Sequence, residues 1–218
     1  MIGDKLNIKK EHIDAGQSLS DILLPKIEDS EGKFVITVAG ESGAGKSEIA
    51  FTLSEKLLEK GVKSAILQQD DYFVYPPKTN ADMRKKDIGH VGLSEVRLEL
   101  LDQNLRDILD GKTEIEKPLV IYEEDRVTSE MIKVDTVKVI IVEGTYTTSL
   151  NNVQQHVFID RTRMDTKESR KERAREEQDE YLERILEIEH DIISANKARA
   201  DIIITRDYKA EVNDETEK

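Results

Sequence analysis

Residues 40–47 read GESGAGKS and fit the pattern G-x-x-x-x-G-K-[ST]. The apolar run KFVITVA at 33–39 precedes this loop and has the short, β-branched character of a strand. After the loop, SEIAFTLSEKLLEKG at 47–61 repeats its apolar residues on one helical face and ends at a glycine. A strand, a glycine-rich loop and a helix in this order are the context that the motif requires, so a turn that merely packs is the less favoured interpretation.

The composition of the loop indicates how it would bind a phosphate. Glycines let backbone amides of the loop and of the helix N-terminus approach a phosphate without obstruction by Cβ atoms. The Lys46 side chain can reach the β and γ oxygens, and the Ser47 hydroxyl can ligate Mg²⁺. We therefore expect a nucleoside triphosphate with Mg²⁺, bound by the following residues: Gly40, Ser42, Gly43, Ala44, Gly45, Lys46 and Ser47.

Strand-like and helix-like segments alternate outward from this loop. Further strands are predicted at 64–69, 137–144, 155–160 and 200–205, a long helix from a Ser94 cap to Gly111, and a hairpin or irregular excursion at 117–134. Such alternation implies right-handed crossovers and a parallel sheet. The expected fold is α/β, a P-loop NTPase with a mainly parallel sheet flanked by helices and a small β-hairpin excursion.

Composition limits the classes of partner. The 218 residues carry a formal net charge of -13, which disfavours a nucleic-acid partner because phosphate backbones select basic surfaces. The chain has no cysteine, and its four histidines show no metal-ligand spacing. Neither a membrane-spanning run nor a signal peptide is recognisable, which predicts a cytoplasmic protein.

The chain is expected to form one domain with two appendages. Residues 1–30 indicate an appended helix, 31–207 the P-loop domain, and 208–218 an acidic tail that frays. The insertion VYPPKTNADMRKKD at 74–87 suggests a stiff loop because of its two prolines.

Two aspartates follow the second predicted strand, in QQDDYFVYPPKTN at 68–80. The carboxyl ends of parallel strands form the edge at which such sheets bind ligands. A kinase needs a carboxylate there to accept a proton from the attacking hydroxyl and to help hold the metal. A turn or a helix cap is the alternative explanation of this pair.

From about residue 33 to 207 the sequence resembles the uridine kinase family, within the group that includes nicotinamide riboside kinases, phosphoribulokinase and pantothenate kinase. The resemblance rests on four elements: the GESGAGKS loop, QDDYF at 69–73, VIIVEG at 139–144, and DTKESRK at 165–171 followed by ADIII at 200–204. It implies an ATP-dependent transfer to a hydroxyl group, and a helical lid at about 161–180.

The resemblance also implies roles for individual residues. Asp70 corresponds to the catalytic base, Glu143 joins Ser47 and Asp70 around Mg²⁺, and the lid places Arg170 and Arg173 with Lys46 among the catalytic residues. A solvated helix with paired charges is the ordinary alternative for the lid arginines. The residues expected to bind the acceptor are Asp71, Tyr72, Asp87 and Tyr122.

The acceptor is left open by the sequence. The family's histidine after the substrate tyrosine has no counterpart here, so the acceptor could be a nucleoside, a sugar or a vitamin precursor. The second class is a nucleotide-binding regulator or an NTPase without an acceptor. A GTPase is disfavoured because Arg199 stands where N-K-x-D requires aspartate. The expected partners are ATP and a small-molecule acceptor, with neither nucleic acid nor membrane, and a homo-oligomer is an open alternative.

Overall fold

The structure, a computed structural model, describes residues 6–173 and 179–213, although the side chain of Arg173 also lies outside the described part. Within these residues the central sheet consists of β1 (Phe34–Gly40), β2 (Ser64–Gln68), β5 (Val139–Glu143), β6 (Gln155–Ile159), β7 (Ile202–Ile204) and β8 (Ala210–Val212). The strand order is β2-β5-β1-β6-β7-β8, and only β8 runs antiparallel to its neighbour. The predicted α/β fold with a mainly parallel sheet is confirmed.

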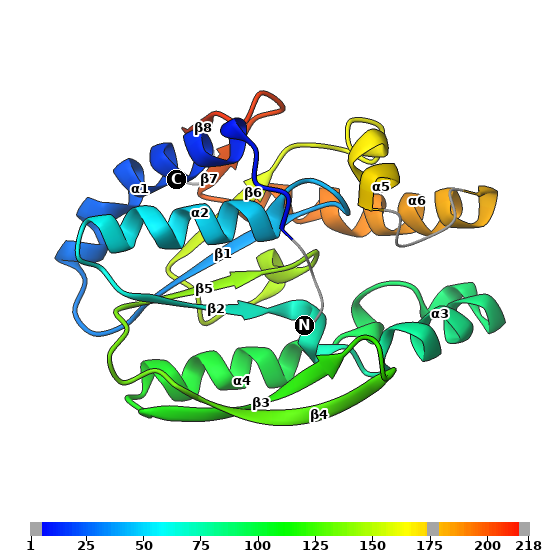
Figure 1. The fold of residues 1–218 in the computed structure, drawn as a ribbon, viewed down its shortest axis with the longest axis horizontal. Helices are drawn as coiled ribbons and strands as arrows, with labels where there is room; N and C mark the ends of the chain where they lie inside the picture. The colour runs from blue at the N-terminus through cyan, green and yellow to red at the C-terminus, as the bar shows by residue number, and fades with distance from the viewer. Residues whose placement is uncertain (1–5, 174–178, 214–218) are drawn as a thin grey trace.

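Helices cover both faces of this sheet (Figure 1). On one face lie α1 (Lys10–Asp29) and α2 (Lys46–Glu59), and on the other α4 (Leu98–Leu109) and α6 (Glu180–Ala195). The shorter helices α3 (Pro77–Lys86) and α5 (Lys167–Arg173) lie at the right of the view. Single 3₁₀ turns are found at Gln69–Tyr72, Ile88–His90, Leu93–Glu95, Thr147–Ser149 and Lys197–Arg199.

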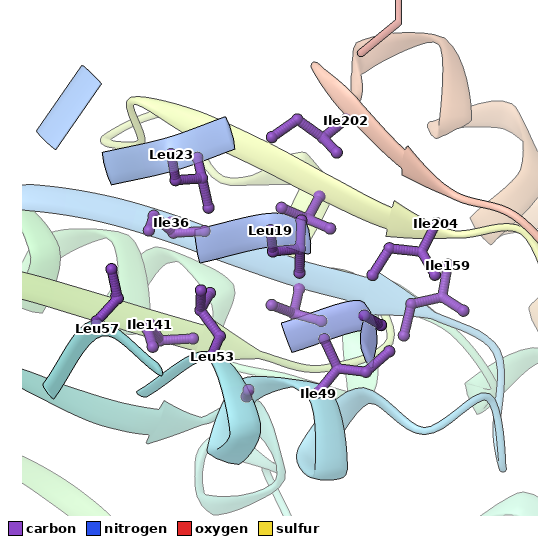
Figure 2. Close-up of a cluster of buried hydrophobic side chains, with 14 of the residues drawn as sticks. Leu19, Leu23, Ile36, Ile49, Leu53, Leu57, Ile141, Ile159, Ile202 and Ile204 are labelled. Atoms are coloured by element: carbon purple, nitrogen blue, oxygen red, sulfur yellow. The ribbon is translucent and has the colours of Figure 1, made fainter. Parts of the chain in front are cut away.

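The alternation of side chains along β1 divides the core into two layers. Ile36 and Val38 belong to the cluster shared with α1 and α2, whereas Val35 and Ala39 face the cluster built with α4 and α6. Every residue of β1 is buried, as expected for a strand covered on both faces. In Figure 2 the α1 and α2 side chains meet the isoleucines of the sheet, and those labelled are Leu19, Leu23, Ile36, Ile49, Leu53, Leu57, Ile141, Ile159, Ile202 and Ile204.

The two expected appendages are part of the domain. Leu19 of α1 is fully buried, and Gly16 allows α1 to approach Thr52 of α2 closely, where the Thr52 hydroxyl donates a hydrogen bond to the His12 carbonyl at 2.9 Å. At the other end, Tyr208 is buried and β8 pairs with β7. The expectation of a frayed tail is therefore wrong for residues 208–213, and residues 214–218 lie outside the described part.

Other local predictions also need correction. The insertion at 74–87 is not a stiff loop, because α3 begins at Pro77, a position where proline's missing N–H costs no helical hydrogen bond. Helix α4 begins at Leu98 rather than after Ser94, which lies in a 3₁₀ turn. The hairpin is confirmed as β3 (Glu114–Ile121) and β4 (Arg126–Lys133), and Pro118 is accommodated because this sheet has only two strands. Within the described ranges, no helix is both long and apolar enough to span a membrane.

Candidate active site

The predicted phosphate-binding loop joins β1 to α2 at the carboxyl edge of the sheet. Gly43 and Gly45 have φ values of 77° and 94°, which favour glycine, and Gly45 is the N-cap of α2. The Lys46 ammonium donates a hydrogen bond to the Glu41 carbonyl at 3.0 Å. The loop therefore presents a helix N-terminus together with a lysine that lies back across it, the arrangement that suits an anionic phosphate chain.

The loop contacts β5 through the residues predicted to hold the metal. The Ser47 hydroxyl donates to Oε1 of Glu143 at 3.0 Å, and Nε2 of Gln68 donates to the same oxygen at 3.2 Å. Burial raises the pKa of Glu143 to about 7, and the nearby charge of Asp70 adds to the rise, while Lys46 opposes it. The structure thus brings together Ser47, Glu143 and Asp70, as the sequence predicts.

Asp70 and Asp71 lie in the 3₁₀ turn that follows β2, which ends at Gln68. Asp70 is half-buried and lies on the side of Glu143. Asp71 is buried, and its oxygens accept the Lys117 ammonium at 2.6 Å and the Val120 amide at 3.0 Å. The carboxylate of Asp71 thus binds the hairpin to the domain, and this geometry does not support the predicted role in acceptor binding.

The other predicted acceptor residues are dispersed. Tyr72 is fully buried and its hydroxyl donates to Asn104 at 2.9 Å, so the expected acceptor contact is corrected to a core position. Asp87 is exposed and accepts the Gly89 amide at 2.9 Å in a local turn. Tyr122 is half-buried in the β3–β4 turn. The acceptor roles of Asp87 and Tyr122 remain predictions.

The region predicted as a lid contains α5, which packs on the loop. A Cβ atom on Gly43 would lie 3.0 Å from Cγ of Arg170, so the arginine stem lies directly against the loop. One guanidinium nitrogen of Arg170 donates to the Thr166 hydroxyl at 2.6 Å, and another lies 3.8 Å from Glu183 of α6. Arg173 is the last residue of α5; its side chain and residues 174–178 of the predicted lid are outside the described part.

The rear of the loop is supported by α1 and by the C-terminal segment. A Cβ on Gly45 would lie 3.0 Å from Nε2 of His12, and the His12 ring meets Tyr208 edge-on with centroids 5.1 Å apart. The Tyr208 hydroxyl donates to the Ala44 carbonyl at 3.3 Å. Burial lowers the pKa of His12, although the charges of Glu48 and then Glu11 act in the opposite direction.

Two interactions of α6 were missed from the sequence. Nδ1 of His190 lies 2.6 Å from Oε1 of Glu41 in the phosphate-binding loop. Arg84 of α3 binds Glu95 at 2.6 Å and Glu189 at 3.0 Å. Arg84 lies 11 positions from Glu95 and 105 positions from Glu189, so no local sequence pattern connects these residues. Among the described residues, no three or more His, Cys, Asp or Glu side chains form a metal cluster.

The comparison with protein families agrees with this geometry. The model of the phosphoribulokinase/uridine kinase family matches residues 35–212. This chain belongs to that family. The matched segment contains the phosphate-binding loop, the turn that follows β2, and the strand β5. Helix α1 lies outside it.

Members of the phosphoribulokinase/uridine kinase family are also found among individual relatives. The uridine kinase of Ligilactobacillus salivarius is 33% identical over 184 residues, covering 78% of this chain and 84% of the relative. The bifunctional α-galactosidase/sucrose kinase AgaSK of Mediterraneibacter gnavus is 26% identical over 193 residues; the match covers 82% of this chain and 21% of that protein. The solved structure of a "possible uridine kinase" from Bacillus stearothermophilus has a TM-score of 0.59 and 18% identity, covering 84% of this chain and 96% of its own.

Family membership establishes the general chemistry. The chain is a small-molecule kinase, a phosphotransferase with a hydroxyl acceptor, and the family's reaction is ATP-dependent phosphoryl transfer. The predicted resemblance and the P-loop fold are confirmed.

Proposed function

We propose that this kinase transfers the γ-phosphate of ATP to a hydroxyl of a nucleoside or a related metabolite. The observation that supports it most is the contact of Ser47 with Glu143 at 3.0 Å, beside a second carboxylate, Asp70. A serine with only a structural role would not require two carboxylate neighbours, because the two negative charges repel each other. Phosphoryl transfer requires such a pair, one for the metal and one for the acceptor hydroxyl.

The donor set fits Mg²⁺. Magnesium is usually held by one or two carboxylates together with substrate phosphates, which agrees with a serine hydroxyl and the Glu143 and Asp70 carboxylates rather than an all-protein cage. Burial is the main cause of the raised pKa of Glu143, and the nearby charge of Asp70 adds to it. When bound, the metal would neutralise charge on the β and γ oxygens.

The remaining residues of the site then act on phosphate and acceptor. Asp70 takes the proton of the acceptor hydroxyl, and the hydroxyl oxygen forms a bond to the γ-phosphorus. At the same time the bond between that phosphorus and the bridging oxygen breaks, and this oxygen leaves with ADP. Lys46 and the loop amides hold the β and γ oxygens. Arg170, lying against Gly43, supplies positive charge to the group in transfer.

A screen for ADP release tests this function. Purified protein with Mg-ATP is assayed against nucleosides, riboside vitamins, free sugars and pantothenate; sugars are included because a relative is named a sucrose kinase. We expect ADP release that depends on one acceptor class, with a phosphorylated product detected by mass spectrometry. ADP release that no acceptor stimulates would instead support the NTPase alternative.

A further inference from the structure

The two glutamines that precede Asp70 have no role in the mechanism above. Gln68 is the last residue of β2, and its register partner in the parallel pairing of β2 with β5 is Glu143 (Figure 1). Gln69 begins the 3₁₀ turn that carries Asp70, and it is fully buried. Both side chains form hydrogen bonds with the segment at the end of β5, where the metal is expected.

Gln69 holds the Asp70 turn against the end of β5. Its Oε1 accepts the backbone amide of Tyr146 at 2.7 Å. A Cβ atom on Gly144 would lie 2.2 Å from Cβ of Gln69, so any larger residue at this position would force the turn away from β5. Gln68 directly precedes Gln69, and Glu143 directly precedes Gly144. The backbones of Gln68 and Glu143 are therefore held close together.

The side chain of Gln68 binds one particular oxygen of the Glu143 carboxylate. Oε1 of Glu143 accepts from Nε2 of Gln68 at 3.2 Å and from the Ser47 hydroxyl at 3.0 Å. Oε2 of Glu143 has no donor among the described residues, and it is not fully buried. The two oxygens of this carboxylate thus have different surroundings, and Oε2 is the one left for a cation.

A carboxylate that ligates a cation needs partners that fix its orientation. Ligand carboxylates in proteins are hydrogen-bonded by neighbouring groups, and loss of such a neighbour typically costs about 10- to 100-fold in metal affinity or activity. Gln68 suits this task because its Nε2 is a donor without positive charge, so it binds the carboxylate without repelling Mg²⁺. The Ser47 hydroxyl can donate to Oε1 while its own lone pairs face the metal.

We propose that Gln68 is a positioning residue for Mg²⁺: its amide holds Oε1 of Glu143 and so keeps Oε2 available to the cation that accompanies the nucleotide. This inference rests on the proposed function and adds to it a residue that acts through Glu143. If Gln68 acts in this way, it contributes to nucleotide affinity only when the metal is present.

Calorimetry with a non-hydrolysable ATP analogue tests this without an acceptor. The affinity is measured in Mg²⁺ and again in EDTA, and the ratio of the two affinities gives the contribution of the metal. Gln68→Met removes the amide at similar length. We expect the ratio to fall by about tenfold or more, with the affinity in EDTA unchanged. A loss by the same factor in both media would be a structural effect on the loop and would overturn the inference.

Gln154→Met is the matched control. Oε1 of Gln154 accepts the Val35 amide at 2.6 Å near the start of β1, at the end of that strand opposite the phosphate-binding loop. The melting temperature of this variant should fall while the affinity ratio stays at the parent's value. An equal fall of the ratio in Gln154→Met and Gln68→Met would contradict the positioning role.

Gln68→Asn provides a second variant at the same position. It keeps the amide but shortens the side chain by one methylene, so its affinity ratio should lie between those of the parent and of Gln68→Met. This variant also carries the test if Gln68→Met does not fold. A ratio equal to the parent's in every folded Gln68 variant would overturn the inference.

Glu143→Ala separates this inference from the proposed function. Gln68→Met added to Glu143→Ala should cause no further loss, because the carboxylate that Gln68 orients is gone; a full further loss would mean that Gln68 acts elsewhere. A ratio that falls in Glu143→Ala but not in Gln68→Met would overturn the inference alone. A ratio that Glu143→Ala leaves unchanged would instead contradict the metal site of the proposed function.

Discussion

Asp70 and Asp71 are chemically identical neighbours in different surroundings. One lies beside Glu143 at the carboxyl edge of the sheet, and the other is buried under the β3–β4 hairpin with Lys117. The sequence identifies the pair but assigns both to ligands. What separates them is the 3₁₀ turn that begins at Gln69, because the direction of each side chain depends on where the strand ends.

Asp70→Asn should lower kcat by about 10²- to 10⁴-fold, since a positioned general base is removed. ATP affinity, measured by calorimetry, should change little. The steady-state rates are measured with the acceptor found in the screen. A loss of only a few-fold would contradict the role of Asp70 as base.

Asp71→Asn should act on stability instead. It removes the charge that pairs with buried Lys117, so the free energy of unfolding should fall by about 1.5–3 kcal/mol in a denaturant titration. Turnover of the protein that remains folded should stay within a few-fold of the parent. A large loss of turnover in a stable Asp71 variant would mean that Asp71, and not Asp70, is the catalytic base.

Glu143→Gln should raise the Mg²⁺ concentration needed for half-maximal activity, because a neutral amide is a poorer ligand for a hard cation. The fold should persist, since an amide oxygen can still accept from the Ser47 hydroxyl. The measurement is a magnesium titration at saturating ATP. An unchanged titration would mean that Glu143 only terminates a buried strand.

At the scale of elements, the sequence predicted those helices and strands whose pattern of apolar residues lies within the element itself. β1, β5 and α2 were predicted because each has a clear apolar period or run of its own. α3 was missed because its paired prolines suggested a loop, and β8 because three residues acquire strand structure only by pairing with β7. The contacts of α6 depend on residues up to 149 positions apart and leave no local signal.

Helix α1 should confer a pH dependence on stability through His12. The folded pKa of His12 is below its ordinary 6.5, so the unfolded chain takes up the proton first. Stability should therefore fall as pH decreases through about 6.5 and level off below the folded pKa. His12→Asn, which can still accept the Lys9 amide, should flatten unfolding profiles between about pH 7.5 and 5.5.

The comparison of the two profiles isolates His12. Burial also lowers the pKa of His156, but this residue is present in both proteins and cancels in the difference. Parallel profiles for the parent and the variant would contradict the prediction.

At the scale of the whole molecule, the domain is larger than the segment matched by the family. The family match begins at residue 35, yet α1 supplies a layer of the core over β1 and α2. His12 of α1 and Tyr208, which lies between β7 and β8, meet behind the phosphate-binding loop. Nucleotide binding should therefore depend on His12, a residue outside the matched segment.

Leu19→Ala should lower the free energy of unfolding by about 2–5 kcal/mol, the cost of a cavity at a fully buried leucine. Ile13→Ala on the same helix is the control; Ile13 is 44% exposed, and the change should be within about 0.5 kcal/mol. Both are measured by denaturant unfolding. If both substitutions change the free energy of unfolding equally and only slightly, α1 is an appendage and not part of the core.

The contact of His190 with Glu41 connects the phosphate-binding loop to α6 and, through α6, to α3. α6 carries His190, bound to the loop that holds the nucleotide, and directly before it Glu189, bound to Arg84 of α3. A nucleotide that displaces Glu41 would shift α6 and, through Glu189, α3, which is followed by the predicted acceptor residue Asp87. Reciprocity then requires the acceptor to change nucleotide affinity by the same factor. Cooperativity between the two substrates would then originate in a single imidazole–carboxylate contact.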